Sequence, residues 1–233
     1  MTIKLLCLDA DDTLWYNERH FKSTEAAFCS LMAPFAPEEV VRARLETTGS
    51  ANVRLYGFGA KGFTLSMIEA ALAVAGDRLP AGTVADLVAL GRELHDFPLE
   101  LLDGVADTLA LLSAQVRLHL VTKGDIVHQE AKFAASGLGD LFEGVDIVSK
   151  KDRSTFERLF QRCDVDPSHA AMVGDSVKSD ILPALAAGAW GVLIPPEHVS
   201  HHERADQPVH DRRFVRLQRF SDLPDWIAGV SKG

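Results

Sequence analysis

Near the N-terminus the sequence reads Ile3-Lys4-Leu5-Leu6-Cys7-Leu8-Asp9-Ala10-Asp11-Asp12-Thr13-Leu14. A short apolar run stops at Asp9, and three carboxylates stand within the next few positions, at Asp9, Asp11 and Asp12. Short, continuous apolar runs are typical of strands that are buried on both faces of a sheet. The stretch therefore predicts a buried strand whose carboxyl end carries acidic side chains.

From Leu101 onward, short apolar runs alternate with helical patterns. The predicted strands are 117–121, 145–148, 170–173 and 190–194, and the predicted helices between them are 105–112, 126–136, 154–163 and 181–187. This alternation favours parallel strands joined by helices that cover the sheet. We therefore expect an α/β fold with a Rossmann-like doubly wound parallel sheet.

The stretch from Glu18 to Gly91 does not fit this alternation, because it shows helical patterns and little strand signal. For a chain of 233 residues, one domain with an insertion is the natural expectation. We predict an α/β core domain formed by residues 1–15 and 100–233. Residues 16–99 are predicted to be an inserted helical cap domain.

Parallel α/β sheets bind ligands beyond the carboxyl ends of their strands. The side chains at the predicted strand ends are Asp9, Asp11, Thr122, Lys150, Lys151, Asp175 and Asp180. Carboxylate oxygens suit a hard cation, which predicts bound Mg²⁺. A lysine can neutralise the charge of a transferring phosphoryl group. The Thr122 hydroxyl and the loop amides at Lys123 and Gly124 can bind the other phosphate oxygens.

The first two acids have complementary chemical roles. Asp9 is expected to act as a nucleophile and to form an aspartyl-phosphate. Asp11 is expected to protonate the leaving oxygen and then to activate the water that breaks the aspartyl-phosphate.

Three sequence motifs resemble those of the haloacid dehalogenase-like hydrolase superfamily. The segment Asp9-Ala10-Asp11-Asp12-Thr13 resembles the first motif, DxDxT. The second motif, an apolar strand that ends in Thr or Ser, is similar to Leu120-Val121-Thr122-Lys123-Gly124. The GDxxxxD motif is similar to Gly174-Asp175-Ser176-Val177-Lys178-Ser179-Asp180.

The resemblance implies a role for each matching residue. Asp9 is similar to the nucleophile, which also binds the metal, and Asp11 to the acid/base, whose backbone carbonyl binds the metal. Thr122 matches the hydroxyl that binds phosphate, and Asp175 matches a metal ligand. Asp180 matches an acid that orients the lysine or the waters of the metal. The predicted magnesium site comprises these four acids.

The phosphate-binding lysine has two candidates. The family pattern KPxPxxF fits Lys150 by its count to Phe156, but the prolines are missing. Another pattern, with an acid after the lysine and an aromatic five residues on, favours Lys151. We predict Lys151 as the phosphate lysine, with Lys150 as the alternative.

The second acid of the first motif separates reaction classes within the superfamily. Dehalogenase relatives lack it, since a halide leaving group needs no proton, so Asp11 favours phosphate esters. The resemblance implies a Mg²⁺-dependent phosphatase acting on a small-molecule phosphate monoester. The alternatives are a phosphomutase or phosphotransferase of the same fold, and a non-catalytic phosphate-binding protein.

The predicted cap contains an unusual stretch, Tyr56-Gly57-Phe58-Gly59-Ala60-Lys61-Gly62-Phe63. Its glycines, aromatic residues and lysine predict a shaped loop before a helix. Lys61, or Arg54 just before this stretch, is a candidate for substrate contact. The alternative is an ordinary helix connection with aromatic anchors.

Composition excludes several classes of protein. The formal net charge is −9, which argues against a broad surface for nucleic acid polymers. No apolar run approaches the length needed to span a membrane, and no signal peptide precedes Asp9. We therefore expect a cytoplasmic protein. The polar segment 201–213 is interpreted as a surface loop.

Overall fold

The computed structural model describes residues 2–198, 203 and 205–232. The chain divides into two compact units, Met1–Tyr16 with Leu99–Gly233, and Asn17–Pro98. Part of the predicted surface loop, residues 201, 202 and 204, lies outside the described residues.

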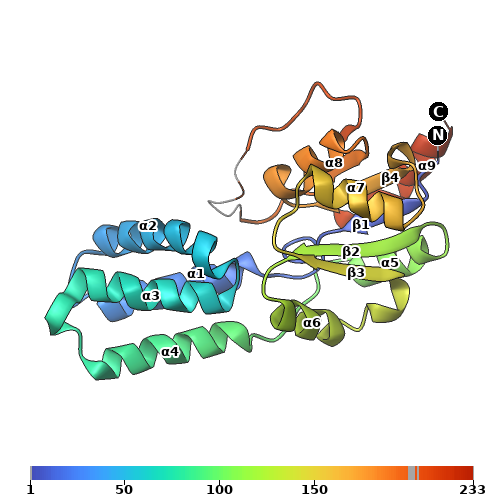
Figure 1. The fold of residues 1–233 in the computed structure, drawn as a ribbon. Helices are drawn as coiled ribbons and strands as arrows, with labels where there is room; N and C mark the ends of the chain where they lie inside the picture. The colour runs from blue at the N-terminus through green and yellow to red at the C-terminus, as the bar shows by residue number, and fades with distance from the viewer. Residues whose placement is uncertain (1, 199–202, 204, 233) are drawn as a thin grey trace. The chain divides into compact units, whose positions relative to one another are not determined.

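The first unit contains a parallel sheet, of which Figure 1 labels β1 to β4. The strands lie in the order β3-β2-β1-β4-β5-β6. Its strands are β1 (Leu5–Leu8), β2 (Arg117–Lys123), β3 (Gly144–Val148), β4 (Ala170–Gly174), β5 (Trp190–Leu193) and β6 (Phe214–Arg216). This order confirms the predicted α/β, Rossmann-like fold. Strand β6 has no counterpart among the predicted strands, because its three residues lie in an arginine-rich stretch with little strand signal.

Helices cover both faces of this sheet (Figure 1). They are α5 (Val105–Ser113), α6 (Ile126–Ala135), α7 (Arg153–Arg162), α8 (Leu182–Ala186) and α9 (Leu223–Lys232). Alternate residues of β1 serve the two faces: Leu6 and Leu8 pack in the cluster that includes α5 and α9, whereas Leu5 and Cys7 pack with α7. Since β1 is buried on both sides, its sequence is continuously apolar rather than alternating.

The position of the site follows from the strand order. After β1, the chain adds β2 and β3 on one side of β1, and it then returns to add β4, β5 and β6 on the other side. The connections therefore diverge between β1 and β4, which leaves a crevice beyond the carboxyl ends of these two strands. The main chain keeps β1 and β4 paired to their last residues, since the Asp9 amide donates to the Val173 carbonyl at 2.9 Å.

The second unit is helical. It contains α1 (Glu18–Met32), α2 (Glu38–Tyr56), α3 (Ala60–Ala75) and α4 (Ala81–His95). Its core is built from side chains of all four helices, among them Phe28, Leu45, Met67 and Leu87. Helix α3 is rich in alanine on its buried side, which allows its neighbours to approach closely.

Two segments of the first unit lead to the helical unit and back from it, and they are hydrogen-bonded to each other. Trp15 forms an antiparallel bridge with Leu101. The Tyr16 amide donates to the Glu100 carbonyl, and the Leu102 amide donates to the Leu14 carbonyl, both at 3.0 Å. The sheet unit is thus closed across the point where the helical unit is inserted.

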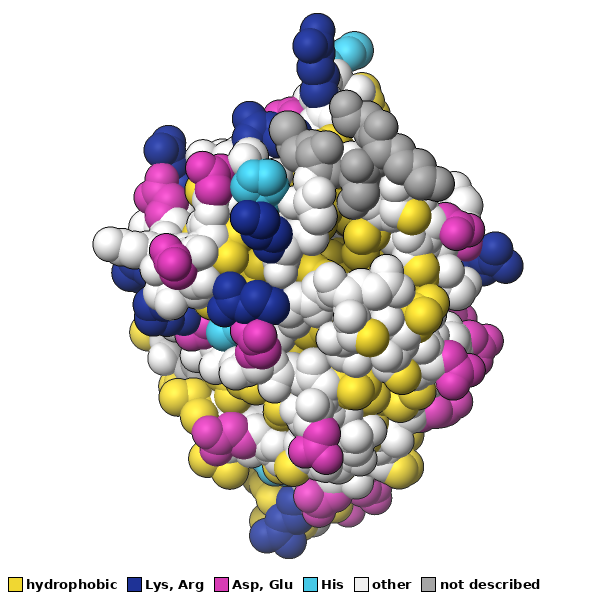
Figure 2. Space-filling view, turned by 90° about the vertical axis from the view of Figure 1, so that its right-hand side faces the viewer, with side chains coloured by type: hydrophobic (Ala, Val, Ile, Leu, Met, Phe, Trp, Pro, Cys, Tyr) yellow, Lys and Arg dark blue, Asp and Glu magenta, His cyan; other side chains and the backbone are white. Residues whose placement is uncertain are grey.

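The surface carries mixed charge on the face drawn in Figure 2, where basic and acidic side chains are interspersed with hydrophobic ones. This face therefore does not present a uniformly positive or uniformly negative surface. Across the described residues, every helix is too short or too polar to cross a lipid bilayer.

Candidate active site

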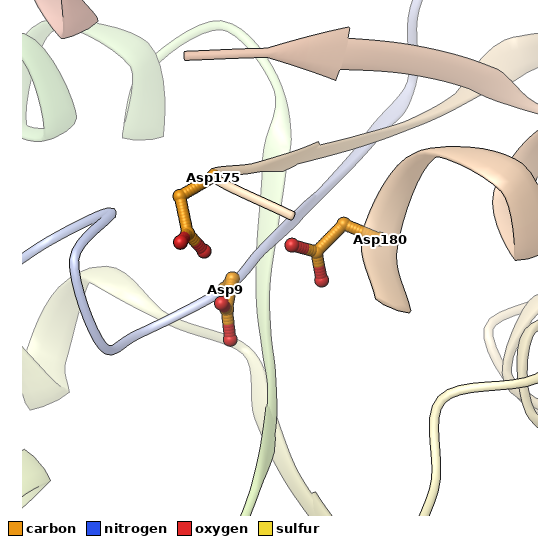
Figure 3. A group of neighbouring side chains, drawn as sticks. All are labelled: Asp9, Asp175 and Asp180. Carbon is orange, nitrogen blue, oxygen red and sulfur yellow. The ribbon is translucent and has the colours of Figure 1, made fainter. Parts of the chain in front are cut away.

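Three carboxylates converge beyond the carboxyl ends of β1 and β4 (Figure 3). Each of Asp9, Asp175 and Asp180 offers one oxygen, and these oxygens lie within 4.8 Å of one another. Asp9 follows β1 and Asp175 follows β4, whereas Asp180 belongs to a π-helical turn, Val177–Ile181, that starts two residues after Asp175. The register of two neighbouring parallel strands brings together acids that are more than 160 residues apart in the sequence.

This crowding changes the protonation of the acids. Burial raises the pKa of Asp175 well above its ordinary value, and the nearby charges of Asp9 and Asp180 raise it further. Burial also raises the pKa of Asp180, to about 7, although the Lys151 ammonium opposes the shift. Buried carboxylates that repel one another and offer only oxygen ligands fit a hard divalent cation. Among the described residues, these acids form the group that could hold a metal ion.

The loop after β3 adds a lysine to the acids. The Lys151 side chain is 1% exposed, and its ammonium donates to Asp9 and, at 2.7 Å, to Asp180. Burial alone would lower its pKa, but Asp180 and Asp9 raise the pKa above the ordinary value. The neighbouring Lys150 is 77% exposed and lies 3.9 Å from Asp152. Of the two candidate lysines, the structure brings Lys151 to the acids.

Asp11 lies beside this cluster with its carboxylate fully engaged. It accepts hydrogen bonds from Trp15 Nε1 at 2.7 Å, from Gln129 Nε2 at 3.0 Å and from the Lys132 ammonium. Burial favours a higher pKa for Asp11, but Lys132 outweighs it and holds the pKa below its usual range. The next residue, Asp12, has φ of 56°, a left-handed conformation that Asp tolerates better than most residues.

Thr122 ends the buried part of β2 and is 2% exposed. Its hydroxyl lies 2.9 Å from Gln129 Nε2, which also donates to the Lys123 carbonyl at 2.9 Å. Gly124 follows with φ of 144°, which is open to glycine but strained for other residues. The loop at Lys123 and Gly124 thus turns around the Gln129 side chain.

The Lys123 side chain lies in a second polar cluster. Its ammonium donates to Ser179 Oγ at 2.7 Å and to Glu203, which also accepts from the hydroxyls of Ser176 and Ser179. Burial would raise the pKa of Glu203, but Lys123 and the two hydroxyls lower it to about 2. The remaining predicted site residue, Lys61, belongs to the helical unit, in the first turn of α3.

Sequence reasoning missed four polar residues of this region: Gln129, Lys132, Ser176 and Glu203. The spacing of Gln129 and Lys132 was a usable signal, because residues three apart lie on one face of a helix that starts directly after Thr122 and its loop. Ser176 was another, since it follows the first acid of the GDxxxxD motif and caps the π-helical turn by accepting from the Ser179 amide at 2.9 Å. No sequence pattern points to Glu203.

Comparison with known proteins places this site in context. The family model of haloacid dehalogenase-like hydrolases matches residues 3–188. A crystal structure of a haloacid dehalogenase-like family hydrolase from Xanthomonas campestris is 33% identical, with a TM-score of 0.87 over 99% of this chain and 91% of that chain. A 2-haloacid dehalogenase from Pseudomonas syringae is 21% identical and shares the fold, with a TM-score of 0.62 over 98% of this chain and 100% of its own.

One curated relative is the Enolase-phosphatase E1 of Frankia alni, which is 34% identical over 117 residues. The match spans 47% of this chain and 49% of that protein, so the chain covers about half the length of this relative. The family model, in contrast, extends over Asp9, Asp11, Thr122, Lys151, Asp175 and Asp180. The resemblance drawn from the motifs is confirmed: the chain belongs to the haloacid dehalogenase-like hydrolase family.

Proposed function

We propose that this hydrolase is a Mg²⁺-dependent phosphatase that acts on a small-molecule phosphate monoester through an aspartyl-phosphate on Asp9. The observation that carries the proposal is the position of the Asp11 carboxylate. Asp11 follows Asp9 by two residues, and its carboxylate accepts hydrogen bonds from Trp15, Lys132 and Gln129. A leaving alkoxide needs a proton, which a carboxyl group can supply, whereas a leaving halide does not. The enolase-phosphatase name of the Frankia alni relative agrees with phosphate chemistry.

The first chemical step transfers the phosphoryl group. An Asp9 oxygen attacks phosphorus, the bond from phosphorus to the ester oxygen breaks, and Asp11 gives its proton to that oxygen. Lys132 favours the ionised form of Asp11, and the negative charge of a phosphate beside it favours the protonated form. Lys151 and the Thr122 hydroxyl are proposed to bind the phosphoryl oxygens.

The second step regenerates the enzyme. Asp11 removes a proton from water, the water oxygen attacks phosphorus, and the bond from phosphorus to Asp9 breaks to release inorganic phosphate. The carboxylates of Asp9, Asp175 and Asp180 and the backbone carbonyl of Asp11 are proposed to hold Mg²⁺. When bound, the cation offsets the crowded negative charge and polarises a phosphate oxygen.

The helical unit Asn17–Pro98 is proposed to act as the cap that selects the substrate. Lys61 is the proposed contact to the part of the substrate that leaves. Two residues with positive φ, Gly57 and Gly59, shape the loop just before its helix. This loop fixes where α3 starts and so the position of Lys61 in its first turn, and replacement of Lys61 by Met is expected to raise KM more than it lowers kcat.

The proposal is tested by phosphate release from 4-nitrophenyl phosphate, with Mg²⁺ and with EDTA. We expect Mg²⁺-dependent turnover that Asp9→Asn lowers at least about 10³-fold, because the amide cannot act as the nucleophile. Asp140→Asn, at an exposed position of the same unit, is the matched control and should retain activity. Circular dichroism checks that both variants are folded.

Two outcomes would contradict the phosphatase assignment. One is halide release from 2-chloropropionate together with no phosphate release from any ester. The other is an Asp9→Asn protein that keeps more than a trace of phosphatase activity.

A further inference from the structure

Glu203 carries a mostly buried carboxylate that lies outside the acids of the candidate active site. It belongs to the connection between β5 and β6, and its side chain is 13% exposed. Its Oε1 atom accepts from the Lys123 ammonium, and its Oε2 atom accepts from the hydroxyls of Ser176 and Ser179. Burial would raise the pKa of Glu203, but these partners lower it to about 2, so the group is an ionised acceptor at neutral pH.

The partners of Glu203 come from two segments that the proposed reaction uses. Lys123 is the last residue of β2 and directly follows Thr122, whose hydroxyl is proposed to bind phosphate. Ser176 and Ser179 lie between the two acids of the GDxxxxD motif. Hydrogen bonds to a charged group are stronger than those between neutral groups. One carboxylate thus holds the end of β2 and the metal-binding motif together.

The contacts continue from Glu203 to the proposed metal site through Ser176. The buried Ser176 hydroxyl donates to Glu203 and accepts from the Ser179 amide at 2.9 Å. The backbone amide of the same residue donates to Asp180 Oδ2 at 3.0 Å. A hydroxyl that is held at both its hydrogen and its oxygen fixes the residue that carries it. Glu203 therefore supports the amide that binds one oxygen of Asp180.

Asp180 is the acid that this support orients. Its carboxylate is fully buried, and its other oxygen, Oδ1, accepts from Lys151 at 2.7 Å. It is one of the three acids whose oxygens lie within 4.8 Å of one another (Figure 3). Acids that bind metals are oriented by hydrogen bonds from residues outside the metal site, and loss of such a residue weakens metal binding by about 10- to 100-fold.

We propose that Glu203 is a positioning residue, which holds the Asp180 carboxylate in place for Mg²⁺ through the Ser176 hydroxyl. This inference rests on the proposed phosphatase function. Glu203 takes no part in the chemical steps, and its effect is on the affinity of the site for Mg²⁺. A higher concentration of Mg²⁺ is therefore expected to compensate for its loss.

The experiment is a double-variant cycle on the full chain. The rise of the melting temperature with MgCl₂, at constant ionic strength, gives the Kd of Mg²⁺ without any substrate. Glu203→Ala is expected to raise this Kd about tenfold, and Ser176→Ala to a similar extent. In the Ser176→Ala background, Glu203→Ala should add less than about twofold, because the contact through which it acts is already lost. Simple removal of a negative charge would act equally in both backgrounds.

Two further variants separate the hydrogen bond from the charge. Glu203→Gln keeps an oxygen that can accept from the Ser176 hydroxyl, so its Kd should stay within about threefold of wild type. Glu197→Ala removes the same charge from the same connection, at a side chain that is 65% exposed, and is the matched control. Its Kd should equal that of wild type.

Hydrolysis of 4-nitrophenyl phosphate gives the second measurement. At low Mg²⁺, Glu203→Ala should be slower than wild type in proportion to its Kd. At saturating Mg²⁺, its kcat should return to within about threefold of wild type, because the occupied site is intact. A side chain that only supports the fold would lower kcat at every Mg²⁺ concentration.

Each other outcome overturns the proposal in a distinguishable way. An unchanged Kd in Glu203→Ala, or an equal change in both backgrounds, would overturn the role of Glu203 and leave the phosphatase function intact. If Glu203→Ala does not fold, Ser176→Ala decides, and a wild-type Kd or an unfolded protein there would assign these contacts to the fold alone. A wild-type protein that neither binds Mg²⁺ nor releases phosphate would overturn the proposed function and this inference with it.

Discussion

Lys150 and Lys151 are adjacent in sequence, yet they have opposite environments. Lys151 is 1% exposed and lies between Asp9 and Asp180, whereas Lys150 is 77% exposed near Asp152. Removal of one partner from a buried ion pair leaves uncompensated charge, and its destabilisation is about 3–5 kcal/mol. An exposed pair contributes about 0–1 kcal/mol. Loss of the Lys151 ammonium is therefore expected to destabilise the protein more than loss of the Lys150 ammonium, and only Lys151 contacts Asp9 and Asp180.

Replacement of each lysine by methionine tests this difference. We expect Lys151→Met to lower kcat for phosphate release at least about 100-fold and to lower the melting temperature, because Asp9 and Asp180 lose their buried counter-charge. Lys150→Met should change neither quantity measurably. Steady-state kinetics and thermal melts of the two proteins decide the question, and a similar loss in both would contradict the assignment of Lys151.

Some residues of the candidate site could be predicted from the sequence, and others could not. Asp9, Thr122 and Asp175 could be located from sequence because each follows an apolar run, and parallel strands end at one edge. The spacing of Gln129 and Lys132 marks one face of α6, but the rotation of α6 about its axis decides whether that face meets Asp11, and the sequence does not fix that rotation. Glu203 could not be located either, because it lies between β5 and β6 in a polar segment of sequence without a strand or helix pattern.

At the scale of elements, the π-helical turn after β4 controls the position of Asp180. The Ser176 amide donates to Asp180 Oδ2 at 3.0 Å, and the Ser176 hydroxyl accepts from the Ser179 amide, so the turn closes on itself. π-helical turns are rare and are frequent at functional sites. Sequence analysis predicted a helix from residue 181, but the π-helical turn before it has no characteristic spacing of apolar residues. The position of Asp180 therefore depends on a local structure that the sequence pattern does not predict.

Gly174→Ala is the corresponding test. A Cβ atom at this position would lie 2.2 Å from Asp180 Oδ2, so the carboxylate has to leave its present position. We expect kcat to fall about 10- to 100-fold while the protein remains folded, because small displacements in a reaction site reduce rates strongly. Gly139→Ala is the matched control, since a Cβ atom there meets nothing within 4 Å. Unchanged kcat in Gly174→Ala would show that Asp180 is not needed where it lies.

At the scale of the whole molecule, the acidic cluster opposes folding and favours cation binding. The raised pKa of Asp175 means that its charged form is less stable in the folded protein than in the unfolded chain at neutral pH. A cation that binds the folded state reverses this balance, and its contribution grows with its concentration above Kd. Function is thus retained at the expense of stability.

Thermal melts of wild type and Asp175→Asn, with MgCl₂ or NaCl at equal ionic strength, test this balance. In EDTA we expect Asp175→Asn to melt at a higher temperature than wild type, since the neutral amide relieves the repulsion. MgCl₂ should raise the melting temperature of wild type by at least about 3 °C and should leave the variant nearly unchanged. An equal effect of MgCl₂ on both proteins would place the cation elsewhere.

The bridge between Trp15 and Leu101 has a consequence for the history of such a chain. Because the segments that lead out of and back into the sheet unit are hydrogen-bonded to each other, the sheet unit holds its own ends together whatever stands between them. Residues 17–98 can then be lengthened, shortened or exchanged in evolution without a change in strand register. The chemistry of the sheet unit and the substrate selection proposed for residues 17–98 can then diverge separately, as two parts under different selection.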